Sequence, residues 1–260
     1  IAGSGYVNDF TGALTASFED VSFSSEKMPF TLSHVYNGYN AGKIQQTLNV
    51  GSGWQLSIQE SIEPKTIGGE TKYKYTDGDG TEHYFEKNTS NVWKDDSGLD
   101  LTLTIENDKY TISDKKDNCR IFSRDLTLNN VTPLSQLKDN HDNTVTMNFT
   151  DKKLTSVTDS GGRTITFHVD SSNNSLSSIS WFGDKTISYT YEDGTDGYDF
   201  YHKLVQVKYP GQSEVNTGNT GSDNIATYTY SSSNTLTDMV DNNKGIGVHY
   251  DHAWINNSYR

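Results

Sequence analysis

The residues of this chain that could do chemistry include acidic pairs set in turns. Asp77-Gly-Asp79-Gly has the beginning of a calcium loop. It lacks a glutamate at the twelfth position and most of the oxygen ligands that such a loop needs, so a plain Asp-Gly hairpin turn is the favoured interpretation. Asp193-Gly-Thr-Asp196-Gly-Tyr-Asp199 is a richer acidic loop. Incidental cation binding stays open for this second loop.

Histidine, cysteine and serine side chains are also present, but their spacing does not indicate a joint site. His249-Tyr-Asp-His252 carries two imidazoles three residues apart. On a strand such residues face opposite sides, which disfavours a shared metal ion. Cys119 is the single cysteine, so an internal disulfide is excluded. The serines include no Gly-x-Ser-x-Gly nucleophile elbow. We assign no catalytic, cofactor-binding or metal-ligating residue and predict that the chain is not an enzyme.

Three aromatic residues form the candidate contact site for a ligand. Tyr198, Phe200 and Tyr201 lie in the acidic loop that follows Asp193. Aromatic faces in such a loop could stack on sugar rings or contact another protein. In the alternative, which we favour, they fold back onto the sheet, because large apolar groups rarely stay exposed without a role. Both interpretations stay open at this point.

The composition limits the fold class and the partners. Of the 260 residues 32% are hydrophobic and 12% aromatic, and the aromatic content argues against disorder. Abundant Thr, Ser, Tyr, Asn and Gly suit half-buried strands joined by polar turns, which predicts an all-β fold. The net charge is −13 and no Lys/Arg cluster is present, so nucleic acid is not an expected partner. No stretch approaches the roughly 18 apolar residues of a membrane span. The start without methionine favours a fragment or a processed piece.

Alternating apolar runs separated by turn residues predict a series of antiparallel hairpins. The runs at 73–75 and 83–85 flank an Asp-Gly turn, which is the strongest short-range hairpin signal. The runs at 99–105 and 110–112 form the next expected hairpin. The stretch at 132–137 could form one helical turn.

A short pattern recurs four times in the second half of the chain. It consists of a leucine, any two residues and a second apolar residue, followed by a turn and an alternating strand; the copies begin at Leu154, Leu176, Leu204 and Leu236. Residues three apart face opposite sides of an ideal strand, so each copy predicts a β-bulge or a strand covered on both sides. Successive copies lie 22, 28 and 32 residues apart, and the extra length falls in loops at 192–202 and 210–224. Such repetition indicates a modular fold.

The repeats and four front segments resemble one protein family. From Phe149 to Arg163 the chain reads Phe-x-Asp-x-x-Leu-x-x-Val-x-Asp-x-x-Gly-Arg, which resembles the tyrosine-aspartate (YD) repeat of Rhs proteins, and Tyr250-Asp251 is similar to the dipeptide that names the repeat. The front segments follow the order of the Rhs core; they are Val7-Asn8-Asp-Phe-Thr11-Gly12, Leu32-Ser-His-Val-Tyr36-Asn37, Gly51-Ser-Gly53-Trp54, and Asp79-Gly80-Thr81 with His83-Tyr84-Phe85. His34 stands where the family usually has arginine. The chain contains no segment like the one that holds the self-cleaving aspartates, so self-cleavage is not carried over.

The resemblance implies a curled, extended sheet of antiparallel β-hairpin repeats that forms part of a spiral shell. A front segment would occupy 1–130 and diverged repeats 131–260, in one continuous sheet. The expected function is structural: the wall of a bacterial protein, secreted or at the cell surface, that encloses or presents a downstream, toxin-like polypeptide. That polypeptide of the same full-length protein is the expected partner, and no cofactor is expected. A cell-surface adhesin that binds a glycan or a protein is the alternative, and a hydrolase is a weaker one.

Overall fold

The computed structural model describes residues 3–8, 12–24, 27–193, 202–211, 224–232, 234–242, 244–251, 254–255 and 258–259. These residues form β-strands and two short 3-10 helices. The elements are β1 Gly3–Val7, β2 Leu14–Phe23, β3 Phe30–Asn37, η1 Gly38–Asn40, β4 Trp54–Leu56, β5 Ser61–Ile67, β6 Glu70–Thr76, β7 Glu82–Lys87, β8 Trp93–Asp95, β9 Thr102–Ile105, β10 Lys109–Ser113, β11 Cys119–Ser123, η2 Arg124–Leu126, β12 Thr132–Pro133, β13 Gln136–Lys138, β14 Thr144–Thr150, β15 Lys153–Thr158, β16 Thr164–Asp170, β17 Ser175–Trp181, β18 Lys185–Asp193, β19 His202–Tyr209, β20 Asn224–Tyr230, β21 Leu236–Asp241, β22 Ile246–His249, β23 Trp254–Ile255 and β24 Ser258–Tyr259. The predicted all-β, antiparallel class is confirmed. No helix in the described part of the chain is long and apolar enough to cross a membrane.

The chain divides into two compact units whose segments interleave. Unit 1 comprises Ile1–Val21, Ser33–Gln55 and Thr166–Arg260, and unit 2 comprises Ser22–Leu32 and Leu56–Ile165. The sequence-based division at residue 130 follows the repeat pattern and stays a prediction.

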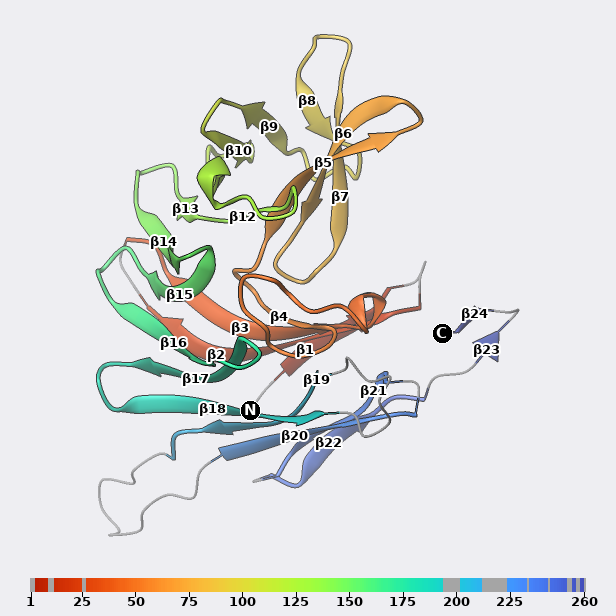
Figure 1. Ribbon diagram of the computed structural model, residues 1–260, viewed down its shortest axis with the longest axis vertical. Coiled ribbons are helices and arrows are strands. Elements are labelled where there is room, and N and C mark those ends of the chain that lie inside the picture. Colours follow the sequence, from red (N-terminus) through yellow and green to blue (C-terminus); the bar gives the residue numbers. More distant parts are fainter. Residues whose placement is uncertain are drawn as a thin grey trace. The chain divides into compact units, whose positions relative to one another are not determined.

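Unit 2 contains a series of hairpins in which each strand from β5 to β11 pairs with the next (Figure 1). The predicted Asp-Gly hairpin is confirmed, since Tyr75 of β6 lies opposite His83 of β7. The next predicted hairpin is confirmed as β9 and β10, with Tyr110 opposite Ile105. Leu103, Ile112 and related alternating side chains are buried, as a strand with one covered face requires.

The helical turn expected at 132–137 is wrong. This stretch holds β12 and β13 instead. Pro133 pairs with Ser61 of β5, and Gln136 pairs with Ile121 of β11. Pairing with β5 and β11 therefore satisfies backbone hydrogen-bonding groups of this segment, and this pairing outweighs the weak local preference for a helical turn.

Acidic and amide side chains build a recurring five-residue turn in unit 2. The backbone N–H of the first residue donates to the carbonyl four residues later, and the side-chain Oδ1 of the first residue accepts from the backbone N–H groups two and four residues later. The turns begin at Asp77, Asn88, Asp114, Asp139 and Asp159. Such side-chain acceptors mimic a backbone turn. The plain hairpin interpretation of Asp77-Gly-Asp79-Gly is confirmed, because its first carboxylate closes this turn.

Each of the four Leu-x-x-apolar copies contains a β-bulge, which is one of the two structures that its spacing predicts. In the first copy Leu154 pairs with Phe149 while Ser156 pairs with Asn148, so one extra residue, Thr155, is inserted. The register shifts in the same way at the other copies, beside Val169, Tyr191 and Tyr230. The extra residue turns both the leucine and the apolar residue three positions later towards the interior. All eight of these side chains are buried; they are Leu154, Val157, Leu176, Ile179, Leu204, Val207, Leu236 and Met239.

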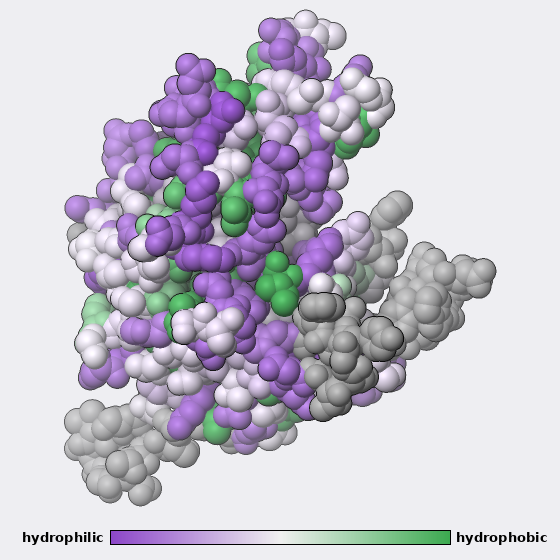
Figure 2. All heavy atoms as spheres, in the orientation of Figure 1, coloured by the Kyte–Doolittle hydropathy of each residue, from purple (hydrophilic) through white to green (hydrophobic). Residues whose placement is uncertain are grey.

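The first strands of unit 1 belong to a separate four-stranded sheet, and they line the pocket that is described below. β1 is the terminal strand of a four-stranded sheet with the order β1-β2-β3-β4, and it pairs with β2 from Gly3 opposite Phe18 to Val7 opposite Leu14. Every residue of β1 is exposed, whereas β2 is largely buried. Figure 2 shows a face dominated by hydrophilic residues, with hydrophobic ones in small separate groups.

Candidate functional site

A buried polar cluster lies in the core of unit 1. The Asp20 and His34 side chains, from β2 and β3, are fully buried, and His34 Nδ1 lies 2.8 Å from Asp20 Oδ1. Tyr189 Oη donates to Asp20 Oδ2 at 2.9 Å, and Tyr209 Oη donates to Asp20 Oδ1 at 3.2 Å. Tyr228 Oη lies 2.7 Å from His34 Nε2. We call these five residues the Asp20 cluster.

Aromatic rings close the Asp20 cluster from solvent. Phe18 stacks on His34 with ring centroids 5.2 Å apart, and Trp54 lies 5.3 Å from the same imidazole. Trp54 Nε1 donates to Tyr230 Oη at 2.8 Å. Burial raises the pKa of Tyr189, Tyr209 and Tyr228 above the ordinary value of a phenol. These tyrosines therefore stay neutral donors, and the cluster is suited to holding strands together, since it offers a substrate no access.

A second buried carboxylate lies in unit 2. Glu60 Oε2 accepts from Tyr75 Oη at 2.6 Å and from Arg120 Nε at 2.9 Å. Burial raises the pKa of Glu60, although the Arg120 guanidinium and the Tyr75 hydroxyl oppose this effect. In the described part of the chain, no buried side-chain nitrogen or oxygen lacks a hydrogen-bond partner. Glu60 is thus a second internal tie between strands.

Ser175, His202 and Asp193 form a relay that has the order of a catalytic triad. Ser175 Oγ lies 2.7 Å from His202 Nε2, and His202 Nδ1 lies 2.5 Å from Asp193 Oδ1. In a hydrolase the nucleophilic serine is accessible to the substrate, whereas here Ser175 is 3% exposed and it is the Asp193 side chain that is 78% exposed. Asn49 Nδ2 also donates to Ser175 Oγ at 3.1 Å. A nucleophile must reach its substrate, and Ser175 does not.

Ser97, His83 and Asp77 form a second relay, in unit 2. His83 lies 3.0 Å from Ser97 Oγ through Nδ1 and 2.9 Å from Asp77 Oδ2 through Nε2. Ser97 is exposed. The backbone N–H groups of Asp96 and Leu99 donate to other acceptors of the protein, so they do not form an oxyanion hole beside the serine. The relay ties the loop at 96–100 to the Asp77 turn.

The residues singled out from the sequence are distributed as follows. Tyr198, Phe200 and Tyr201 lie outside the described residues, as do His252 and most of the acidic loop after Asp193. His249 is exposed, with its two ring nitrogens 2.6 Å from Asp238 and 3.1 Å from Asp251. Cys119 is half-buried, and its Sγ lies 3.4 Å from Ser113 Oγ. Among the described residues, no group of three His, Cys, Asp or Glu side chains is placed to hold a metal ion.

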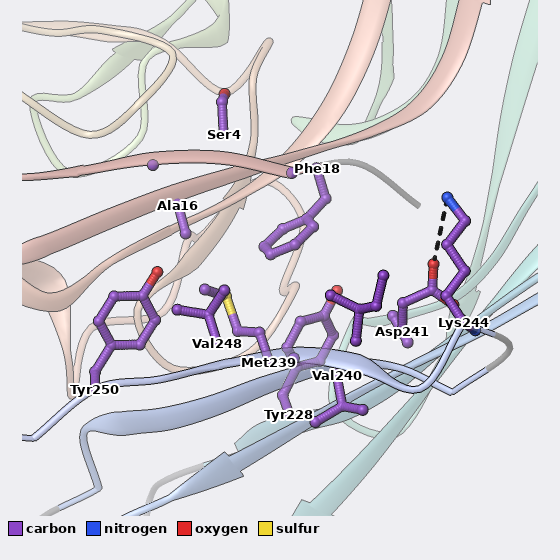
Figure 3. A pocket seen from close by; sticks show the side chains of 15 residues that line it. Ser4, Ala16, Phe18, Tyr228, Met239, Val240, Asp241, Lys244, Val248 and Tyr250 are labelled. Carbon is purple, nitrogen blue, oxygen red and sulfur yellow. Dashed lines mark hydrogen bonds and ion pairs between the residues drawn. The ribbon is translucent and has the colours of Figure 1, made fainter.

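A pocket of about 340 Å³ lies in unit 1 between β1 and β2 on one side and β20 to β22 on the other. Figure 3 shows Ser4, Ala16 and Phe18 on one wall, with Tyr228, Met239 and Val248 on the other. At one end Lys244 Nζ lies 4.0 Å from Asp241 Oδ2. Sequence reasoning missed this pocket. Its wall on β22 belongs to the fourth repeat copy, but nothing in the repeat pattern indicates that this copy differs from the others in exposure.

The comparisons with known proteins give a partial likeness. No protein-family model matches the chain. Over 149 residues the chain is 29% identical to the tRNA nuclease WapA of Bacillus subtilis strain 168 and to the tRNA3(Ser)-specific nuclease WapA of Bacillus spizizenii. Each match covers 57% of this chain and 6% of the relative. The chain is therefore similar to a small part of two much longer proteins.

Proposed function

We propose that the chain is a structural wall segment of an Rhs/YD-repeat protein, curled into part of a shell that encloses or presents another polypeptide of the same protein. The bulged hairpins support this proposal, because a bulge bends its strand and increases the local twist, and repeated bending curls a sheet. The front motifs and the partial likeness to WapA agree with it. The nuclease activity named for the relatives is not extended to this chain, since the match covers 6% of their length.

The Asp20 cluster is the observation that carries the proposal. Tyrosines from three successive repeat strands, β18, β19 and β20, converge on two residues of β2 and β3. A protective wall needs strands that do not open, because an exchanging strand would admit a protease. A buried, fully bonded polar cluster holds strands in a unique arrangement, since any slip leaves buried donors without partners. The Asp, His and Tyr side chains of the Asp20 cluster therefore serve to hold strands together.

Limited proteolysis of the full-length protein tests enclosure. We expect its C-terminal region to be cut at least tenfold more slowly in the intact protein than as an isolated polypeptide. The Asp20→Ala variant should abolish much of that protection, whereas Asp184→Ala, at an exposed turn of the same unit, should retain it. Equal cleavage of the region in the intact and isolated forms would refute enclosure. A bacterial cell-surface or secreted location is part of the same proposal, and surface labelling of intact cells tests it.

A further inference from the structure

We propose that Ser97 is a reactive nucleophile that accepts an acyl group from an activated ester, with His83 as the base that takes the serine proton and Asp77 as the group that orients the base. The inference goes beyond the wall function and does not depend on it, because it assigns a covalent modification site to one loop of unit 2. The transfer is stoichiometric, with one acyl group for each serine.

The first support is the tautomer that the relay imposes on His83. Its Nε2 lies 2.9 Å from Asp77 Oδ2, and its Nδ1 lies 3.0 Å from Ser97 Oγ. An ionised carboxylate only accepts hydrogen bonds, so the neutral imidazole carries its proton on Nε2 and presents a lone pair at Nδ1. The Ser97 hydroxyl then donates to that lone pair. A serine bonded to a base that a third group orients is the arrangement of an activated nucleophile.

The second support is the rigid setting of the base. His83 lies on β7 opposite Tyr75 of β6, and the two rings stack with their centroids 5.7 Å apart. The imidazole is largely buried, with His83 8% exposed. Asp77 is fixed as well, because its Oδ1 accepts from the backbone N–H groups of Asp79 and Thr81. Side chains that are locked in this way keep the geometry that proton transfer needs.

The third support is access to the serine, which separates this relay from the one at Ser175. Ser97 and Gly98 are exposed, whereas Ser175 is buried. Gly98 has a φ of +78°, and a Cβ atom at this position would meet nothing within 4 Å. The backbone N–H groups of Ser97 and Gly98 donate to no other residue in the described part of the chain. These two donors are therefore free to bind the oxygen of a carbonyl that Ser97 attacks.

The reaction transfers one acyl group. Ser97 Oγ attacks the carbonyl carbon of the ester while the hydroxyl proton passes to His83 Nδ1. The C–O bond to the leaving group then breaks, and the imidazolium returns its proton to the departing oxygen. The products are an ester of Ser97 and a free phenol. A good leaving group such as a phenolate is required, because backbone donors on an exposed loop stabilise the oxyanion less than a site that excludes water.

The test incubates the protein with p-nitrophenyl acetate and follows acetylation of each serine by peptide mass spectrometry. Ser90 is the matched control, since it is an exposed serine of the same unit whose hydroxyl bonds to no histidine in the described part of the chain. We expect Ser97 to react at least tenfold faster than Ser90, because a positioned base contributes roughly 10²–10⁴-fold. Ser175, whose relay is buried, should react no faster than Ser90. His83→Gln should lower the rate at Ser97 to that of Ser90.

The pH dependence separates activation of the serine from its exposure. The hydrogen bond to Asp77 raises the pKa of His83 although burial opposes this, and Asp79 and Asp95 add to the effect of Asp77. Only the neutral imidazole takes up a proton, so the rate at Ser97 should rise as the pH passes through the raised histidine pKa and then reach a plateau. A serine without a base should instead react faster with every increase in hydroxide concentration. This profile uses the unaltered protein, so it decides the proposal even where His83→Gln fails to fold.

Three outcomes would overturn the proposal. The first is a rate at Ser97 that is less than tenfold above that of Ser90. The second is an unchanged rate at Ser97 in folded His83→Gln. The third is a rate at Ser97 that rises with hydroxide and reaches no plateau, which would show that exposure alone makes this serine react.

Discussion

Replacing Asp20 with alanine should remove a large part of the stability of unit 1. The carboxylate accepts from two tyrosine hydroxyls and contacts His34, so the variant leaves three buried polar groups without their partner. One such buried group costs about 1–3 kcal/mol. Because the groups share one site, their costs do not add fully. We expect a loss of about 4 kcal/mol, against a total of roughly 5–15 kcal/mol for a domain.

Urea unfolding followed by tryptophan fluorescence measures this loss, because Trp54 packs against His34. Tyr209→Phe removes a single donor at 3.2 Å and should cost about 1 kcal/mol. Asp184→Ala, at an exposed turn, should leave the midpoint unchanged. A loss below about 1 kcal/mol for Asp20→Ala, or an equal loss in Asp20→Ala and Tyr209→Phe, would refute the argument that the cluster fastens the strands.

Two predictions concern unit 2. The hydrogen bond to Asp77 raises the pKa of His83, and the bond from His83 lowers the pKa of Asp77 although burial opposes this. The stability lost in His83→Gln should therefore be greatest at a pH between the ordinary pKa values of the two groups, and it should shrink both as the pH rises through the raised histidine pKa and as the pH falls through the lowered aspartate pKa. A difference in urea midpoint that does not change with pH would contradict this. Gly78→Ala should cost about 1–3 kcal/mol because its Cβ would lie close to the Ser57 carbonyl oxygen. Gly161→Ala, whose Cβ meets nothing closer than 3.4 Å, is the matched control, and equal melting temperatures for the two variants would contradict the steric argument.

Much of the fold was predictable because its signals are local. The Asp-Gly turn sets the β6 and β7 hairpin within a dozen residues. The spacing of Leu154 and Val157 predicts the bulge, because an ideal strand cannot turn both side chains inward. The segment at 132–137 was not predictable, since its backbone is paired by strands from elsewhere in the chain.

The Asp20 cluster and the pocket were not predictable for a related reason. Asp20 meets Tyr189 and Tyr209 across 169 and 189 residues of sequence. No period or motif links an acidic residue in β2 to tyrosines so far away. Ser175 and His202 likewise belong to different strands, and their contact follows from pairing that only the folded chain reveals.

The long sequence separation within the Asp20 cluster has a consequence for biosynthesis. Ribosomes add about 5–20 residues per second, so the tyrosines that meet Asp20 and His34, which lie 169 to 194 residues later, emerge roughly 8–40 seconds after them. During that interval β2 and β3 expose their apolar faces without the strands that later cover them. The front of the chain must therefore remain soluble, or be held by a chaperone, until β20 has left the ribosome. Nascent chains stalled before β18 should be more sensitive to protease and more prone to aggregate than chains stalled after β20.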